Sequence, residues 1–366
     1  MRSLRLFLCG DVMTGRGVDQ ILPYPCNPVL YEAEVRDARV YVQLAEQING
    51  PIPHPVDFAY VWGDALTELE QAQPDWRIVN LETSITTHEH PWPDKEIHYR
   101  MNPRNIECLT AARINCCVLA NNHVLDWGHA GLLETLQTLS EVGLAYSGAG
   151  KNLKQAQAPA ILEIPGKERV LVFGLGSTTS GIPREWSAAD DRPGVFLLPD
   201  LSEATAEQVA QFMLAHKQPG DVLIASLHWG ANWGYDIPDD QVRFAHRLIE
   251  AGVDVIHGHS SHHAKGIEVY RNKLILYGCG DFVNDYEGIG SYAWYRGDLA
   301  VMYLADLNPD TGELVQLCLV PFQARRLRLT WACADDVRWL AQRLNESSHA
   351  FATRLRIQDE RHILLG

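Results

Sequence analysis

The sequence lacks the features that mark several protein classes. No apolar run is long enough for a membrane-spanning helix, and the short run from Leu4 to Cys9 ends at Asp11 without a signal-peptide cleavage site. The eight cysteines form no C-x-x-C pair, as is typical of free thiols in a reducing compartment. Several are expected to be buried because they lie in apolar runs: Cys9, Cys116, Cys117, Cys279 and Cys318. We therefore expect a cytoplasmic protein with no direct membrane anchor.

Positive charge is also scarce. The 366 residues include 31 Lys and Arg against 46 Asp and Glu, a formal net charge of -15. Phosphate backbones and anionic membranes attract basic surfaces, so this balance argues against a nucleic-acid partner. It leaves room for a small anionic substrate, because a metal centre supplies local positive charge.

The order of apolar segments predicts an α/β fold. Strand-like and helix-like segments alternate from residue 3 to about residue 260, with no repeats and no Gly- or Ser-rich linker. Strands are expected at 5–9, 77–81, 114–120, 170–175, 222–227, from 253 and at 274–277. Helices are expected at 32–48, 63–71, 105–112, 131–142, 201–216 and 241–251, and residues 10–17 are expected to form a turn. We predict one domain over 1–298, with 299–366 packed on it as paired strands (299–307 and 313–322) and a helix (334–344).

The most informative stretch runs from Val253 to His263. Apolar residues lead into Gly258, and four of the neighbouring residues are histidines. This pattern predicts a buried strand followed by a metal-binding loop, although a polar loop of ordinary histidines is the alternative. His257 is expected to point away from the site because strand side chains alternate, and His263 is set aside likewise.

Other polar residues follow the ends of other predicted strands. The carboxyl ends of parallel strands meet at one edge, so these side chains should converge in space. The candidates are Asp11, Glu82, Asn122, His123, His228, His259 and His262. Carboxylate, amide and imidazole ligands suit a divalent ion such as Mn, Fe or Zn. One site would be crowded, and two ions about 3.5–4 Å apart, bridged by a carboxylate, could polarise a water between them.

Several candidates have ordinary structural explanations. Asn122 and His123 could cap the helix that follows, and Asp126 could be a surface N-cap. His228 could be a core histidine. Lys95, Arg100 and Arg16, the predicted substrate-binding residues, could bind a carboxylate or phosphate or form surface ion pairs.

Five motifs in fixed order resemble the CapA family of capsule biosynthesis proteins, which is associated with poly-γ-glutamate synthesis. They are Gly10-Asp11, Asn80-Leu81-Glu82, Asn121-Asn122-His123-Val124-Leu125-Asp126-x-Gly128, Leu227-His228-Trp229-Gly230 and Gly258-His259-x-x-His262. The resemblance covers roughly residues 3 to 285. It implies the fold of calcineurin-like metallophosphoesterases, a four-layer α/β/β/α sandwich with a metal site along one edge.

The resemblance also implies roles for individual residues. Glu82 would bridge two ions. Asn122, His228 and His259 would complete one ion, and Asp11 and His262 would hold the other, where Met13 replaces a family histidine. His123 would be the general acid and Asp126 would orient it. Lys95 and Arg100 match a Lys and Arg that the family shows before a Pro.

We therefore expect a metal-dependent hydrolase, with one or two ions, acting on a phosphoester or γ-glutamyl-type amide. Its substrate would be small and anionic or polyglutamate-like. The alternative is a non-hydrolytic, metal-containing accessory protein in polymer synthesis. Such family members usually carry an N-terminal membrane anchor, which this sequence lacks.

Overall fold

Side chains of the first strand pack into two different hydrophobic cores. In β1 (Leu4–Val12), Leu6 and Leu8 belong to one core, whereas Phe7 and Cys9 belong to another. Because strand side chains alternate, this strand is buried on both faces. The computed structural model describes residues 3–163, 168–290 and 292–366, and Met1 and Arg2 of the N-terminal run lie outside these ranges.

The first sheet combines early and late strands of the chain. Its other members are β2 (Trp76–Leu81), β5 (Cys116–Val118), β6 (Ala145–Ser147), β15 (Asp281–Val283), β16 (Leu299–Leu307), β17 (Leu314–Ala324), β18 (Leu329–Trp331), β19 (Leu355–Ile357) and β20 (Ile363–Leu365). The order of this ten-stranded sheet is β19-β20-β17-β16-β1-β2-β5-β6, with β15 paired to β1 and β18 to β17. Pairing is parallel from β15 through β1 to β6 and antiparallel among β1 and β16 to β20.

The second sheet comes from the middle of the chain. Its members are β8 (Ala160–Leu162), β9 (Val170–Gly176), β11 (Val222–His228), β12 (Val255–His259), β13 (Ile267–Tyr270) and β14 (Lys273–Leu276), in the order β13-β14-β12-β11-β9-β8. The four central strands are parallel. Two short ladders pair β3 (Ser84–Ile85) with β4 (Arg100–Met101), and β7 (Ala149–Gly150) with β10 (Gly194–Val195).

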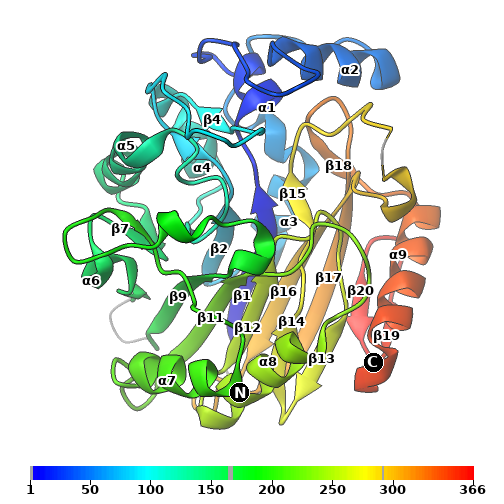
Figure 1. The fold of residues 1–366 in the computed structure, drawn as a ribbon. Helices are drawn as coiled ribbons and strands as arrows, with labels where there is room; N and C mark the ends of the chain where they lie inside the picture. Colours follow the sequence, from blue (N-terminus) through cyan, green and yellow to red (C-terminus); the bar gives the residue numbers. More distant parts are fainter. Residues whose placement is uncertain (1–2, 164–167, 291) are drawn as a thin grey trace.

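The helices lie around the two sheets (Figure 1). They are α1 (Arg16–Ile21), α2 (Arg39–Asn49), α3 (Asp64–Ala72), α4 (Glu107–Ala111), α5 (Gly128–Glu141), α6 (Leu153–Ala156), α7 (Glu203–Leu214), α8 (Asp239–Ala251) and α9 (Ala334–Ser347). Short 3-10 turns occur at Tyr60–Trp62, Pro103–Asn105, Thr178–Ser180, Arg184–Trp186, Ala293–Tyr295 and His349–Phe351. In α8 the buried residues Phe244, Leu248 and Ile249 have helical spacing and form one apolar face.

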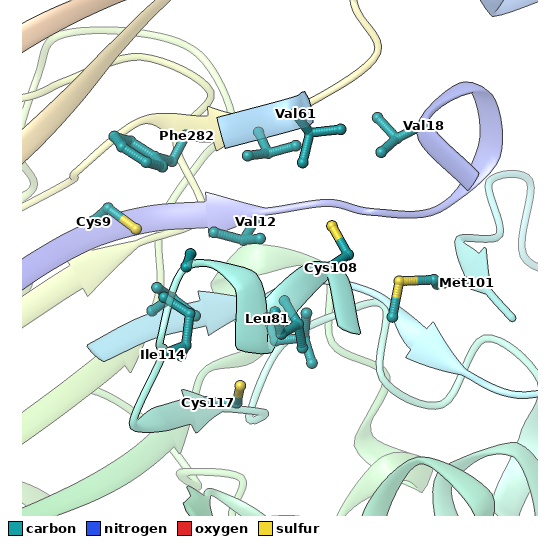
Figure 2. Packing of buried hydrophobic residues seen from close by; sticks show 14 of the residues in the cluster. Cys9, Val12, Val18, Val61, Leu81, Met101, Cys108, Ile114, Cys117 and Phe282 are labelled. Carbon is teal, nitrogen blue, oxygen red and sulfur yellow. The ribbon is translucent and has the colours of Figure 1, made fainter. Parts of the chain in front are cut away.

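The three largest hydrophobic clusters of the described residues account for this arrangement. One contains inward residues of both sheets, such as Leu8 of β1 and Ile224 of β11. A second joins β9, β11 and β12 to α7 and α8. The third joins the first sheet to α1 to α5, and Figure 2 shows part of it, with Val12 and Leu81 of adjacent strands near Cys108 and Phe282. A mixed α/β fold, as predicted, is confirmed.

Some predicted boundaries were wrong. The helix expected at 32–48 begins only at Arg39, because an antiparallel β-bridge between Val29 and Asp37 closes the preceding residues into a loop. The turn expected at 10–17 is divided between the end of β1 and the start of α1. The strand expected at 114–120 is limited to Cys116–Val118.

The C-terminal segment contributes strands to the first sheet. β16 pairs with β1 along five residue pairs, from Leu4 with Leu307 to Leu8 with Tyr303. The domain boundary at residue 298 stays a prediction. Four of the five cysteines expected to be buried are so, whereas Cys318 of β17 is partly exposed. Within the ranges described above, no helix combines the length and apolar character needed to cross a membrane.

Candidate metal centre

Pairs of strands bring the candidate ligands to one edge of the two sheets. His228 and His259 are the last residues of β11 and β12, and their Cα atoms are register partners. Asp11, near the end of β1, is likewise the register partner of Asp281, the first residue of β15. Glu82 directly follows β2. All five side chains are buried, so their polar atoms face one another rather than bulk water.

Two groups of side chains have the geometry of metal ligands. Asp11, His228 and His259 each offer an atom within 4.8 Å of the others. Asp11, His262 and Asp281 form a second such group. Asp11 belongs to both groups, so the two candidate positions are adjacent. Four of the predicted ligands are therefore brought together, and Asp281 joins them.

The remaining predicted ligands border the first group. Oε1 of Glu82 lies 3.8 Å from Nε2 of His228. Oδ1 of Asn122 lies 3.0 Å from the same nitrogen. Asn80, which precedes Glu82 by two residues, donates from Nδ2 to Oδ1 of Asp11 at 2.7 Å. All six predicted metal residues therefore lie at this edge.

A chain of hydrogen bonds selects the nitrogen that His259 presents to the site. Nε2 of His257 lies 2.8 Å from the carbonyl oxygen of Cys9, which can only accept, so this nitrogen carries the proton. Nδ1 of His257 then accepts from the Ser226 hydroxyl at 3.0 Å. Ser226 Oγ in turn accepts from Nε2 of His259 at 2.9 Å. The relay leaves a lone pair on Nδ1 of His259, as a metal ligand requires.

The two facing imidazoles test whether the site fits a cation. Nδ1 of His228 lies 2.8 Å from Nδ1 of His259. When Asn122 presents its oxygen to Nε2 of His228, that nitrogen carries the proton and Nδ1 has a lone pair. Two lone pairs then face each other, which is favourable only beside a cation. The donor set of carboxylate, amide oxygen and neutral imidazole fits a divalent ion.

The electrostatics of the buried groups point the same way. Burial, and after it the Asp281 carboxylate, raises the pKa of Asp11 to about 7. Burial together with Asp11 also raises the pKa of Glu82. Burial lowers the pKa of His228 and of His259, which keeps both imidazoles neutral. Oδ2 of Asp11 has no hydrogen-bond partner in the described part of the chain. A divalent ion would stabilise the ionised carboxylates and bind the neutral imidazoles.

His123 lies beside this edge and is held by three neighbours. Its Nδ1 donates to Oδ2 of Asp126 at 2.7 Å, and its ring stacks on Tyr99 with centroids 3.8 Å apart. Its Nε2 points toward Oε1 of Glu82 at 3.8 Å. Lys95 forms an ion pair with Oδ1 of Asp126 at 2.6 Å. Burial, followed by the charge of Lys95, lowers the pKa of His123.

The three basic residues predicted to bind substrate are all engaged by the protein. Lys95 contacts Asp126, as described. Arg16 is buried and forms ion pairs with Asp285 at 2.5 Å and Glu32 at 2.9 Å. Arg100 is buried too, donating to backbone carbonyls with its guanidinium 3.9 Å from the ring centre of Trp127. Arg16 borders a large cleft, whereas Arg100 does not.

Three residues outside the predicted metal ligands also lie at the site. Asp281 accepts from Nδ1 of His262 at 2.9 Å, and its carboxylate raises the pKa of that histidine although burial alone would lower it. Ser226 and His257 form the relay to His259. The acidic stretch after Gly280 was a visible signal for Asp281. No motif marks Ser226, because its role depends on the pairing of two strands.

The sequence is similar to proteins of bacterial capsule and polyglutamate synthesis. A family model described as bacterial capsule synthesis protein PGA_cap matches residues 5–286. A probable polyglutamine synthesis accessory protein of Mycobacterium tuberculosis is 47% identical over 351 residues, which is 96% of this chain and 92% of that protein. The capsule biosynthesis protein CapA of Bacillus anthracis is 25% identical over 77% of this chain and 60% of its own length. The PGA biosynthesis protein CapA of Bacillus subtilis is 30% identical over 58% of this chain and 53% of its own length.

Proposed function

This chain belongs to the bacterial capsule synthesis protein family PGA_cap, and we propose that it is a metal-dependent hydrolase with a dinuclear centre. The bond would be a phosphoester or a γ-glutamyl-type amide. The observation that carries the proposal is the pair of buried ligand groups that share Asp11. The acidic chain would act without nucleic acid, on a small anionic or polyglutamate-like substrate, in the cytoplasm, where its free cysteines would stay reduced.

We assign the ligands according to the two groups. Asn122, His228 and His259 would hold one ion, and His262 and Asp281 the other, with Asp11 and Glu82 between them. Asp281 would supply a ligand at the ion for which Met13 replaces the family histidine. When bound, the ions would polarise the scissile group and lower the pKa of a coordinated water.

The proposed arrangement is a four-layer α/β/β/α sandwich of the metallophosphoesterase type. The three cores support it, because one lies between the two sheets and the other two lie between a sheet and helices. In such a sandwich the carboxyl ends of parallel strands from both sheets meet at one edge. Asp11 from the first sheet and His228 and His259 from the second would meet there.

We expect a bound anionic substrate to favour the imidazolium form of His123, which would transfer its Nε2 proton to the leaving group. Its Nε2 lies on the side of Glu82, while Asp126 holds the opposite nitrogen. Tyr99 fixes the plane of the imidazole by stacking, so the proton is delivered from one direction. Lys95 would position both groups, because its Nζ lies 2.6 Å from Oδ1 of Asp126 and 3.1 Å from Nδ1 of His123.

The second candidate function is that of a non-hydrolytic accessory protein that uses the metal centre to bind an anionic polymer. The printed description of the Mycobacterium tuberculosis relative, an accessory protein, favours it. In that case the same ligands would bind ions, but the protein would catalyse no hydrolysis and His123 would have no catalytic role.

Metal content and hydrolysis together test the proposal. We expect the purified chain, reconstituted with Mn, to bind close to two ions and to hydrolyse bis-p-nitrophenyl phosphate or γ-glutamyl-p-nitroanilide. The Glu82→Ala variant should lose metal and turnover. Glu89→Ala removes an exposed carboxylate from the loop between β3 and β4 and should retain both.

His123→Ala separates the two candidate functions. A hydrolase should lose about 100-fold or more in turnover while its metal content is unchanged, because general acid catalysis typically contributes that much. Metal binding without turnover on either substrate would favour the accessory protein. Failure to bind metal after reconstitution would overturn the proposed centre.

A further inference from the structure

A large cleft opens directly beside the candidate metal centre. Its volume is about 800 Å³, within the range of organic-ligand sites and much larger than a phosphate ion requires. His262 lines it, together with Tyr99 and Tyr286, whose hydroxyls lie 2.8 Å apart. Tyr99 also stacks on His123. A group bound at the metal centre would therefore continue into this cleft.

Most charged side chains of the cleft are already paired. Arg296 forms ion pairs with Asp298 at 2.7 Å and Asp336 at 2.8 Å. Glu287 accepts backbone N–H groups at 2.7 Å and 3.0 Å. Arg16, which also lines the cleft, forms ion pairs with Glu32 and Asp285. The cleft thus has few charges free for a ligand.

One lining cation is available. Arg325 is exposed and donates to the Asn49 side chain at 3.2 Å, and no carboxylate lies within ion-pair distance of it in the part of the chain that the structure describes. A γ-linked glutamate chain carries a carboxylate on every residue, and desolvating each one without a cation is costly. The cleft therefore suits the uncharged part of a substrate better than a polyanionic segment.

An aromatic wall lies next to the metal ligands. Trp233 and Tyr292 stack with centroids 4.6 Å apart and planes 10° apart. Trp233 also packs on His262 at 5.3 Å, and a Cβ at Gly297 would lie 3.3 Å from its ring. Tyr292 is 55% exposed, and its φ of 70° is uncommon for a residue other than glycine. An aromatic face is thus available where a substrate would leave the metal centre.

The uncharged polar groups complete the chemistry. Asn49, Asn232 and Gln323 line the same cleft, and an amide can both donate and accept. Nδ2 of Asn49 already donates to Glu287, and Nε2 of Gln323 to Asp298. Asn232 therefore offers the amide with the fewest hydrogen bonds to the described residues. Amides suit hydroxyl and carbonyl groups, whereas aromatic faces suit flat or ring-shaped groups that carry C–H bonds or π systems. Sugar rings and nucleobases combine these properties.

We propose that this cleft binds an uncharged, ring-bearing group of the substrate, a sugar or a nucleoside, attached to a phosphoryl group that reaches the metal centre. The exposed face of Tyr292, whose other face stacks on Trp233, packs against the ring, and the amides bind its polar atoms. The inference rests on the proposed function, because it places the phosphoryl group at the ions.

Equilibrium binding to the Mn-loaded protein tests this inference. The probes are inorganic phosphate, glycerol 3-phosphate, glucose 1-phosphate, uridine 5′-monophosphate and a γ-linked glutamate trimer, measured by calorimetry. We expect at least one ring-bearing monophosphate to bind about tenfold more tightly than glycerol 3-phosphate, as one aromatic stacking contact provides. Tighter binding of glucose 1-phosphate identifies a sugar site, and tighter binding of uridine 5′-monophosphate identifies a nucleoside site.

Variants locate the preference in the aromatic wall. In Tyr292→Ala, the ring-bearing monophosphate should bind about as tightly as glycerol 3-phosphate. Tyr292→Phe should keep the preference for the ring-bearing monophosphate. Trp294→Ala is the matched control, because Trp294 is 66% exposed in the same segment but does not line the cleft. Inorganic phosphate should bind equally well to all three variants, which shows that the metal centre is intact.

The outcomes separate this inference from the function on which it rests. Equal binding of all monophosphates, or tightest binding of the glutamate trimer, would overturn the ring-binding site and leave the metal centre standing. A ring preference that persists in Tyr292→Ala would also overturn it. Failure of the protein to load Mn would overturn the proposed metal centre itself, whereas failure of every probe on the Mn-loaded protein would overturn the binding of a phosphoryl group there.

Discussion

The nitrogen that His259 offers to an ion depends on residues that are not ligands. The relay begins at the backbone carbonyl of Cys9 and passes through His257 and Ser226. A carbonyl oxygen cannot donate, so each step has one direction. This explains why His257, which sequence alternation sets apart from the ligands, still belongs to the site.

Ser226→Ala should weaken Mn binding. Without the hydroxyl, Nε2 of His259 loses its acceptor, and the imidazole can adopt the tautomer that protonates Nδ1. We expect Mn affinity to fall about 10- to 100-fold, as for other residues that orient metal ligands. Calorimetric titration with Mn measures it. Ser147→Ala is the control, because it removes a buried hydroxyl outside the site; equal affinities in the two variants would contradict the relay.

Asp281→Asn should halve the metal content. The amide oxygen can still accept from Nδ1 of His262, so the substitution removes the carboxylate charge and leaves the orienting hydrogen bond. We expect one ion per chain instead of two, measured by elemental analysis after reconstitution and desalting. The control Asp335→Asn, at a largely exposed position of α9, should still bind two ions per chain. Full metal content in Asp281→Asn would limit Asp281 to orienting His262.

At the scale of elements, Arg16 connects segments that are distant in the sequence. It begins α1, and its ion pairs reach Glu32 before α2 and Asp285 after β15. Tyr41 of α2 donates its hydroxyl to the same Glu32, and its ring lies 3.8 Å from the Arg16 guanidinium. The guanidinium therefore holds one side of the cleft in place rather than standing free for a substrate.

Arg16→Met should destabilise the protein. Two buried carboxylates would lose their cation, and breaking such a pair typically costs about 3–5 kcal/mol. The free energy of unfolding in urea measures the change. Arg39→Met is the matched control: its side chain is 63% exposed, so removing its ion pair with Asp37 should leave the free energy of unfolding nearly unchanged. Unchanged stability with a raised KM would instead identify Arg16 as a substrate ligand.

At the scale of the whole molecule, the metal-free protein should lose stability as the pH rises from about 6.5 to 8. The pKa of Asp11 is raised to about 7 and that of Glu82 is raised too, so the folded state retains protons that the unfolded state has released. Stability therefore falls as pH passes through the folded pKa. Asp11 alone contributes about 1 kcal/mol over this range.

Thermal unfolding after treatment with a chelator measures this dependence. Histidines whose pKa is lowered, such as His228 and His259, act in the opposite direction, but only below the usual histidine pKa of about 6.5. Asp11→Asn should reduce the slope, and Mn should remove it by stabilising the ionised carboxylates. If stability instead rises with pH across this interval, the raised pKa of the buried Asp11 carboxyl would be contradicted.

The sequence alone was enough to predict the α/β class and to place the candidate ligands at strand ends. Strand side chains alternate and apolar runs end in polar residues, so Asp11, His228 and His259 could be recognised as residues at strand ends. These are local properties. Boundaries were less predictable, as at Arg39, because a β-bridge between Val29 and Asp37 overrides helical spacing.

Only the tertiary structure decided which side chains face one another. The pairing of β15 with β1 brings Asp281 to Asp11, and the pairing of β11 with β12 brings Ser226 to His259. Arg16 and Lys95, both plausible substrate ligands in the sequence, find carboxylate partners in the fold. Such pairings depend on the register between strands and on packing between segments far apart in the chain, which local patterns do not encode.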